Sequence, residues 1–390
     1  MVRFVSAAPK HVKEDHSLGC AEVKFTLKTR VQKISAHAPG RVELLGNHTD
    51  YNEGFVLSAA IDRGVTLTGG RAESNDIKLH SATMDSSAQS EINKLKPDKT
   101  DTWANYVFGV VDCLQRDGYK LGGFEADIES DLPLGAGLSS SAALEVATAT
   151  FLKKLFGLKI EPLHLAKLCR KAENEFVGVN CGLLDQVSST FGKKNHAIFL
   201  DCRKETVENV PFPGNVELLI THSGVKHALV GGEYNERREQ CFEAAKRLGA
   251  VALRDVTSKQ LNAARETLPD LVYRRAMHVV GENERVQHGL EFLLRGDAKA
   301  FGDLMFESHE SSRVNFENST PQLDALVAIA REEPGVLGSR LTGGGFGGAT
   351  VSLIERDAAE RISANFAQKY RERTKHECQT YLCEIADGAH

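Results

Sequence analysis

The chain has 390 residues, of which 41% are hydrophobic and 26% charged, as in ordinary globular proteins. Its formal net charge of −5 argues against a nucleic-acid-binding protein. No stretch approaches the ~18 consecutive apolar residues of a membrane-spanning helix, and the N-terminal residues lack the apolar core of a secretory signal. The eight cysteines form no C-x-x-C pair, which favours buried free thiols in a reducing compartment.

The length favours two domains, because a chain of this size is long for a single hydrophobic core. Local cohesion is weakest near residues 207–215, where Pro211, Pro213 and Gly214 stand close together. We therefore expect an N-terminal domain over residues 1–210 and a C-terminal domain over residues 211–390.

Hydrophobic periodicity predicts alternating strands and helices, and therefore an α/β fold. Short strands around turns are expected over residues 31–68, a helix over 103–117, and a half-buried strand at Phe124, Ala126 and Ile128. A helix that is apolar almost all round is expected over 142–155, and another over 162–176 has proline in its first turn. Later in the chain we expect strands at 198–201 and 216–221, a helical section over 233–305 broken near Pro269, and a glycine-rich loop leading into a strand over 335–354.

The first motif, P-G-R-V-E-L-L-G-N-H-T-D-Y-N-E-G, covers residues 39–54. Five polar side chains crowd its second half: Asn47, His48, Asp50, Tyr51 and Asn52. Convergent hydrogen-bonding groups of this kind suit the hydroxyls of a sugar. The alternative is an Asp/Asn-rich turn closed by a glycine.

The second motif, L-P-L-G-A-G-L-S-S-S-A at residues 132–142, is a glycine-rich loop that opens into the apolar helix. Such a loop brings backbone N–H groups close to an anion, and the helix N-terminus adds partial positive charge, so we interpret it as a nucleotide phosphate site. It lacks the lysine of a Walker A loop, the second glycine of a nucleophile elbow and the third glycine of a dinucleotide fingerprint. A strand-to-helix turn with a serine cap is the alternative. The expected binding positions are Gly135, Ala136, Gly137, Leu138, Ser139, Ser140 and Ser141.

The third motif, S-R-L-T-G-G-G-F-G-G at residues 339–348, has five glycines in six positions and includes Gly344 and Gly345. A tight hairpin turn needs only one or two glycines. Five of them indicate that the backbone approaches something closely.

Together the three motifs resemble those of the GHMP small-molecule kinases, and H-T-D-Y-N is similar to the galactokinase signature. The segments W-A-N-Y at 103–106, C-G-L-L-D-Q at 181–186 and E-Y-N-E-R-R at 233–238 also resemble galactokinases. The resemblance implies a two-domain α/β GHMP kinase fold with the active site in the cleft between domains. It further implies a cytoplasmic enzyme that phosphorylates the anomeric hydroxyl of galactose with ATP and Mg²⁺, and small-molecule substrates without a nucleic-acid or membrane partner.

The same resemblance implies roles for individual residues. Asp185 matches the catalytic aspartate, and Arg41 would pair with it and keep it ionised; a helix N-cap and an exposed strand arginine are the alternatives. Glu173 would bind the metal or lie at a helix boundary, and Trp103 would lie beside the adenine or fill the core. The implied sugar-binding residues are Asn47, His48, Asp50, Gly182 and Tyr234, the implied metal ligands are Ser141 and Glu173, and Gly344 and Gly345 would lie near the site.

Asn47 departs from the family, because galactokinases usually carry an acidic residue directly before H-T-D-Y-N. Asparagine is shorter and neutral, and it has donors as well as an acceptor. We therefore expect a changed contact to one sugar hydroxyl, and a kinase for another hexose or an amino sugar stays an alternative. A sensor that binds sugar and ATP without transfer is the second alternative, although Asp185 and Ser139 to Ser141 are all present.

Overall fold

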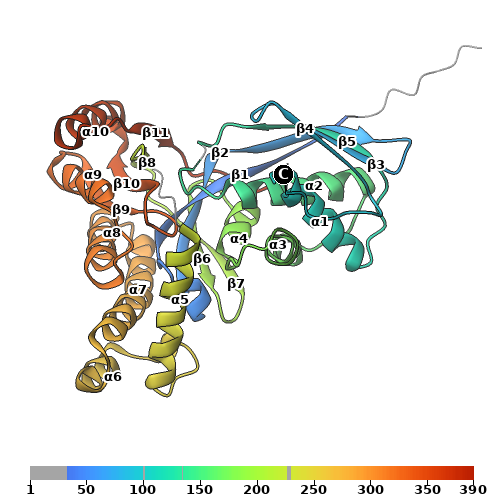
Figure 1. The fold of residues 1–390 in the computed structure, drawn as a ribbon. Coiled ribbons are helices and arrows are strands. Elements are labelled where there is room, and N and C mark those ends of the chain that lie inside the picture. The colour runs from blue at the N-terminus through green and yellow to red at the C-terminus, as the bar shows by residue number, and fades with distance from the viewer. Residues whose placement is uncertain (1–32, 100–101, 134, 226–229) are drawn as a thin grey trace, which may run out of the picture. The chain divides into compact units, whose positions relative to one another are not determined.

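The chain forms two β-sheets, and each has helices packed against it (Figure 1). The computed structural model describes residues 33–99, 102–133, 135–225 and 230–390. By their contacts, residues from Lys33 to His390 form one unit. Mixed sheets and helices confirm the predicted α/β class.

The first sheet has seven strands in the order β4-β3-β5-β2-β6-β7, with β1 paired to β2 outside this path. β2 pairs with β5 through its residues 65–71 and with β6 through residues 55–58, while β1 runs antiparallel along its other edge. The expectation of short strands near the N-terminus was wrong, because β1 and β2 have 12 and 17 residues. The strands are β1 Ile34–Leu45, β2 Phe55–Arg71, β3 Asp76–Ser81, β4 Ser86–Glu91, β5 Phe124–Ser130, β6 His196–Asp201 and β7 Thr206–Pro211.

Helices α1 to α4 follow one another beside this sheet, and α2 packs directly on β1 and β2 (Figure 1). The predicted helices over 103–117, 142–155 and 162–176 are confirmed, the last with its proline in the first turn. Its final turn is a π-helix, a feature often found at functional sites. These elements are α1 Ala104–Arg116, α2 Ser140–Phe156, α3 Pro162–Ala172, the π-helix η2 Glu173–Val177 and α4 Leu184–Phe191.

The second sheet is antiparallel, with the order β11-β8-β10-β9. Residues 335–354 were expected to be a loop and one strand, but they hold two strands, and the glycine-rich loop joins β9 to β10. Helices α8, α9 and α10 pack on this sheet. The bounds are β8 Val216–His222, β9 Val336–Leu341, β10 Ala349–Glu355, β11 Gln379–Cys383, α8 Ala298–Ser311, α9 Pro321–Glu332 and α10 Ala359–Thr374.

The helical section expected over residues 233–305 is interrupted more often than the sequence indicated. Pro269 directly precedes α7, which confirms the predicted break. Further breaks follow Arg247 and Arg295, where Gly249 and Gly296 adopt positive φ angles of 68° and 72°. The remaining elements are α5 Val230–Arg247, α6 Ser258–Ala263, α7 Asp270–Arg295, η1 Asp50–Asn52, η3 Leu253–Asp255, η4 Arg265–Thr267, η5 Ser312–Phe316 and η6 Arg356–Ala358.

Every strand of the first sheet ends by Pro211, and the second sheet begins at Val216. The division of the chain near residue 210 stays a prediction, because residues 33–390 form one unit by their contacts. The expectations for the N-terminal segment, for the start of the strand region at 31–32 and for Leu134 lie outside the described residues.

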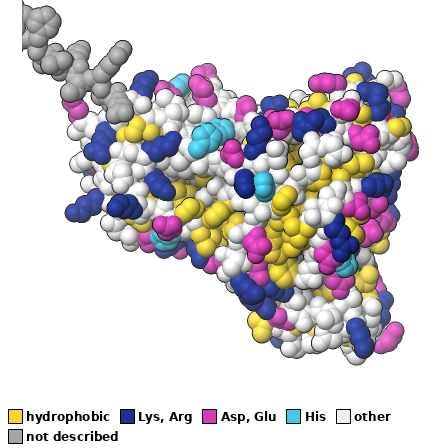
Figure 2. Space-filling model, turned by 180° about the vertical axis from the view of Figure 1, so that it is seen from behind, with side chains coloured by type: hydrophobic (Ala, Val, Ile, Leu, Met, Phe, Trp, Pro, Cys, Tyr) yellow, Lys and Arg dark blue, Asp and Glu magenta, His cyan; other side chains and the backbone are white. Residues whose placement is uncertain are grey.

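The seven cysteines within the described ranges are free thiols, as predicted; four of them are buried, and Cys181, Cys202 and Cys378 are partly exposed. None of the helices that the structure describes is long and apolar enough to cross a membrane. The face turned away from the viewer of Figure 1 carries basic and acidic side chains interspersed, without one basic field (Figure 2). This mixture agrees with the near balance of 48 Lys and Arg against 53 Asp and Glu in the sequence.

Candidate active site

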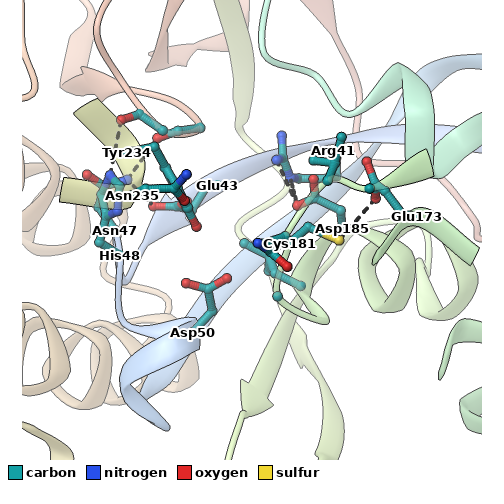
Figure 3. A pocket seen from close by; sticks show the side chains of 17 residues that line it. Arg41, Glu43, Asn47, His48, Asp50, Glu173, Cys181, Asp185, Tyr234 and Asn235 are labelled. Carbon is teal, nitrogen blue, oxygen red and sulfur yellow. Dashed lines mark hydrogen bonds and ion pairs between the residues drawn. The ribbon is translucent and has the colours of Figure 1, made fainter. Parts of the chain in front are cut away.

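A pocket of about 530 Å³ is lined by residues of the first and third motifs and of the segment around Asp185 (Figure 3). Its wall is formed by β1, the loop that follows β1, the segment from η2 to α4, the first turns of α5, and the glycine-rich loop after β9. These segments are far apart in the sequence. Their convergence makes the pocket the candidate site of the chemistry.

Asp185 lies in the first turn of α4 and receives two side chains from other segments. Arg41 on β1 meets its Oδ1 with Nε at 2.8 Å and Nη2 at 2.7 Å, and the Ser139 hydroxyl donates to its Oδ2 at 2.5 Å. The N-cap of α4 is Leu183, so Asp185 is not the cap. Arg41 is no exposed strand arginine either, because its side chain is 7% accessible and its Nη1 donates to the Gly137 carbonyl at 2.6 Å.

The phosphate-loop motif presents its backbone in an unusual conformation where α2 begins. Gly135, Gly137 and Ser139 have positive φ angles of 75°, 69° and 57°. Ser139 occupies the N-cap position, but its side chain does not cap the helix and turns to Asp185 instead. The alternative of a plain serine-capped turn therefore does not describe this loop.

Two carboxylates lie buried behind Asp185. Glu145 on α2 and Glu173 on η2 share one donor, the Gln186 side-chain amide, at 3.0 Å and 2.8 Å. Burial raises the pKa of Glu145 well above its usual range, and the negative charge of Glu173 adds to the effect. Burial also raises the pKa of Glu173, although hydrogen bonds from Cys181, Ser141 and Gln186 oppose the shift.

On the opposite side of the pocket, Asn47 belongs to a closed hydrogen-bond network. Its side-chain amide donates to Glu43 Oε1 at 3.1 Å and to the Gly343 carbonyl at 2.8 Å, and its Oδ1 accepts from Asn318 at 2.9 Å. Its backbone N–H donates to the Glu282 carboxylate at 2.9 Å. The residue is only 1% exposed, so Asn47 is held rigidly in the wall.

His48 lies next to Asn47 with a left-handed backbone φ of 60°. Its Nε2 lies 3.0 Å from the Gly344 carbonyl and its Nδ1 lies 2.8 Å from the Tyr51 hydroxyl. Burial lowers the pKa of His48 to about 4, so the ring is neutral. Because a carbonyl only accepts, Nε2 carries the proton and Nδ1 accepts from the tyrosine. The ring also packs against Tyr234, with 5.1 Å between centroids.

Asp50 explains why position 182 is glycine. A Cβ atom on Gly182 would stand 2.0 Å from Asp50 Oδ2, so any other residue there would displace the Asp50 carboxylate. Burial raises the pKa of Asp50 to about 6, and the nearby charges of Glu43 and Asp185 act in the same direction. Figure 3 shows the Asp50 carboxylate directed into the pocket from below.

The glycine-rich loop joins the two sides of the pocket. The Gly343 and Gly344 carbonyls accept from Asn47 and His48, and a Cβ on Gly343 would lie 3.3 Å from the Gly137 carbonyl. Gly345 has a φ of 81°, and a Cβ there would meet the Asn318 carbonyl at 2.2 Å. Close approach of backbone to backbone is therefore the reason for several of these glycines.

The structure thus brings together most of the predicted site residues. Those in the wall of the pocket are Arg41, Asn47, His48, Asp50, Glu173, Gly182, Asp185, Tyr234 and Gly344. The phosphate loop is adjacent through Ser139 and Gly137 but does not line the pocket. Trp103 directly precedes α1, packs against the core and donates from Nε1 to Ser86 at 3.4 Å, so its place beside an adenine stays a prediction.

Sequence reasoning missed the Glu43, Glu145, Arg340 and Glu282 side chains. Glu43 stands two residues after Arg41, so in an extended strand both point to one face, and this signal was available. Glu145 stands four residues after Ser141 in an otherwise apolar helix, which also places both on one face. No comparable signal identifies Glu282, whose carboxylate accepts from the backbone of Gly46 and Asn47 across more than 230 residues.

Among the described residues, no group of three or more His, Cys, Asp and Glu side chains is arranged to hold a metal ion. The donor set near α2 still suits a hard cation that brings further oxygen ligands with it. Glu173 is a buried carboxylate without an ion-pair partner among the described residues, and the Ser141 hydroxyl bonds to it. Carboxylate and hydroxyl oxygens are ligands that Mg²⁺ accepts together with phosphate oxygens.

Three family models match the chain: GHMP kinases N terminal domain over residues 105–193, galactokinase galactose-binding signature over 24–71, and GHMP kinases C terminal over 290–372. The galactokinase of Thermotoga neapolitana is 43% identical over 352 residues, which are 90% of this chain and 98% of that protein. The galactokinase of Bos taurus is 42% identical over 366 residues, 92% of each chain.

Two solved structures place the fold. The crystal structure of Lactococcus lactis galactokinase complexed with galactose has a TM-score of 0.88 and 32% identity, covering 92% of this chain and 95% of that one. The Methanococcus jannaschii mevalonate kinase is similar with a TM-score of 0.66 at 18% identity, covering 92% of this chain and all of that one. The second likeness concerns the fold alone.

Proposed function

Because the chain belongs to the galactokinase family, we propose that it transfers the γ-phosphoryl group of ATP to the anomeric hydroxyl of galactose. The products are galactose 1-phosphate and ADP. The observation that carries the proposal is the Asp185 carboxylate at the wall of the pocket, held by Arg41 on one oxygen and by Ser139 on the other.

In this mechanism Asp185 orients the anomeric hydroxyl and accepts its proton as the oxygen attacks the γ-phosphorus. The bond between that phosphorus and the β,γ-bridging oxygen breaks, and ADP leaves. Arg41 holds the carboxylate in place through its ion pair with Oδ1. Phosphoryl transfer depends mainly on positioning and charge stabilisation, so two fixed partners on one carboxylate suit it well.

The nucleotide lies, in this proposal, against the loop from Gly135 to Ser141, with its phosphates at the N-terminus of α2. Glu173 and Ser141 would hold Mg²⁺ there, where it would supply positive charge to the transferred group. The support is the buried carboxylate of Glu173, which has no ion-pair partner among the described residues and has the Ser141 hydroxyl beside it. ATP as co-substrate and the free cysteines support a cytoplasmic enzyme.

The test is a sugar panel with coupled detection of ADP. Galactose, glucose, galactosamine and N-acetylgalactosamine are compared by kcat/KM, and the acid lability of the product identifies an anomeric phosphate. We expect galactose to give the highest kcat/KM. A preference for an amino or N-acetylated sugar would favour the other-hexose alternative, for which Asn47 is the reason.

A sensor without transfer is the other alternative, and the same panel decides it. If ATP and galactose both bind but neither ADP nor sugar phosphate appears, the proposed activity is wrong. The intact Ser139, Asp185 and Arg41 arrangement argues against this outcome, because binding alone does not need a carboxylate aimed at the reacting hydroxyl.

A further inference from the structure

Glu43 places a carboxylate in the pocket wall that the proposed mechanism does not use. It projects from β1 on the same face as Arg41, and Figure 3 shows it between Asn47 and the Arg41–Asp185 pair. Its side chain is 6% accessible, so it is buried apart from the part that faces the pocket. A carboxylate in this position needs hydrogen-bond donors for both of its oxygens.

The protein satisfies one of its two oxygens. Oε1 accepts from Asn47 Nδ2 at 3.1 Å and from Arg340 Nη1 at 3.0 Å. No described residue donates a hydrogen bond to Oε2. This oxygen is nevertheless not one of the fully buried side-chain atoms that lack a partner. A carboxylate has about four lone-pair sites. Glu43 therefore retains acceptor capacity at the pocket.

Asn47, by contrast, has no free side-chain hydrogen to donate to a ligand. Both hydrogens of its side-chain amide are used, one by Glu43 Oε1 and one by the Gly343 carbonyl. Its Oδ1 already accepts from Asn318. The amide therefore cannot donate to a sugar without breaking this network, and its effect is to hold the Glu43 carboxylate in place.

Arg340 supplies the positive charge that pairs with the buried Glu43 carboxylate. Its guanidinium is fully buried, and besides Oε1 it bonds the Glu43 backbone carbonyl at 3.2 Å. Burial raises the pKa of Glu43, and the charges of Arg340 and Arg41 oppose that rise. A carboxylate that faces a fixed cation on one side can accept a charge-assisted hydrogen bond on the other.

We propose that Glu43 is the specificity-determining carboxylate for the sugar, accepting a hydrogen bond from one hydroxyl of galactose, and that Asn47 positions it. The inference rests on the proposed galactokinase activity. It revises the expectation that the neutral side chain of Asn47 reads the sugar itself. In this chain the negative charge stands four residues earlier, on the strand instead of the loop.

The test pairs a carboxylate variant with four monodeoxy analogues of galactose, lacking the 2-, 3-, 4- or 6-hydroxyl. The ratio of kcat/KM for galactose to that for each analogue measures how strongly each hydroxyl is recognised. In Glu43→Gln we expect one ratio to fall about tenfold, since a neutral amide makes a weaker bond than a carboxylate. The other three ratios and the KM for ATP should stay within about twofold.

Glu43→Gln leaves Arg340 without its buried anion, so it can fail to fold. Glu43→Asp keeps that charge but withdraws the carboxylate from the pocket, and the same single ratio should fall. Glu333→Gln is the matched control, because Glu333 is equally buried and paired with Arg361 and Lys369 away from the pocket. All four ratios should be unchanged there.

The proposal would be overturned if all four ratios in a folded Glu43→Gln or Glu43→Asp variant equalled those of the unmodified protein. It would also be overturned if Glu333→Gln lowered the same single ratio. Failure of the proposed function is a different result, since the unmodified protein would then form no galactose 1-phosphate at all.

An Asn47→Glu variant tests the positioning role of Asn47 independently. It sets a second carboxylate against Glu43 Oε1 and removes both donors, so we expect the KM for galactose to rise; a lower KM would contradict the positioning role of Asn47.

Discussion

The two sides of the pocket treat buried negative charge in opposite ways. On the sugar side, the carboxylates of Glu43 and Glu282 each contact an arginine, Arg340 at 3.0 Å and Arg285 at 2.5 Å. On the transfer side, Glu145 and Glu173 form no ion pair with any described residue and share a single neutral amide. Only Asp185, at the edge of that side, has an arginine.

This difference indicates the charge of the ligand that each side of the pocket can bind. A buried carboxylate without a counter-charge is unfavourable, and burial therefore raises the pKa of Glu145 and Glu173. A cation that arrives with the nucleotide removes the imbalance on the transfer side. On the sugar side, Glu43 and Glu282 already have arginine partners, so this part of the wall suits an uncharged ligand that forms hydrogen bonds; Asp50, whose pKa burial raises, is the exception there.

Asp185→Ala is the change expected to have the largest effect. The variant loses the group that orients the nucleophile, and removing such a group commonly lowers turnover by about 10² to 10⁴. ATP should still bind, because the phosphate loop is retained. Turnover measured with saturating galactose, together with nucleotide binding by calorimetry, checks this. Near-normal turnover would mean that Asp185 is only a structural partner of Arg41.

Glu173→Gln tests whether the uncompensated charge serves a cation. We expect turnover to fall on the order of 10- to 100-fold and the magnesium concentration for half-maximal rate to rise. Galactose binding without nucleotide should change little. Glu175→Gln, two residues along the same π-helix and paired with Arg116 at the surface, is the control that should leave the magnesium dependence unaltered. An unchanged magnesium dependence in Glu173→Gln would return Glu173 to a helix-boundary role.

Gly182→Ala probes the sugar side by displacing Asp50. Its Cβ would overlap the carboxylate, so Asp50 must move, and we expect the KM for galactose to rise about tenfold with little change in the KM for ATP. Gly232→Ala is the matched control, because nothing lies within 4 Å of the added Cβ on α5. There we expect unchanged kinetics and a helix stabilised by up to about 1 kcal/mol. Equal KM values in both variants would separate Asp50 from sugar binding.

The smallest expected effect is a pH dependence at Asp50. Its pKa is raised to about 6, so protonation of the free enzyme begins well above the usual range for aspartate. If the carboxylate accepts from the sugar, kcat/KM for galactose falls as the pH decreases and reaches about half its plateau near pH 6. Asp50→Asn should abolish this limb of the profile. A profile that is flat from pH 5 to 7 in the unmodified protein contradicts the prediction.

The sequence was informative wherever a local pattern determines the outcome. Pro162 opens α3 and Pro269 precedes α7 because proline suits the start of a helix. The motif around Asp185 could be assigned a place in the site from its resemblance to a family. That resemblance also led to Arg41, whose contact with Asp185 spans 144 residues and follows from no local pattern.

The parts that could not be predicted depend on tertiary contacts. The length of β2 results from pairing with three strands at once, which the periodicity of one segment does not reveal. The π-helical turn at Glu173 and the closure of Asn47 by Asn318 likewise need the folded neighbours. Ser139 looked like a helix cap, and only the position of Asp185 explains why its hydroxyl turns away.

The glycine-rich loop after β9 touches both halves of the site, since Gly343 accepts from Asn47 and lies against the Gly137 backbone, while Gly137 accepts from Arg41. Backbone atoms in such close contact cannot shift independently. We therefore expect galactose and nucleotide to be thermodynamically linked: whichever binds first steadies the loop that the other requires. Linkage then demands that each changes the dissociation constant of the other by the same factor.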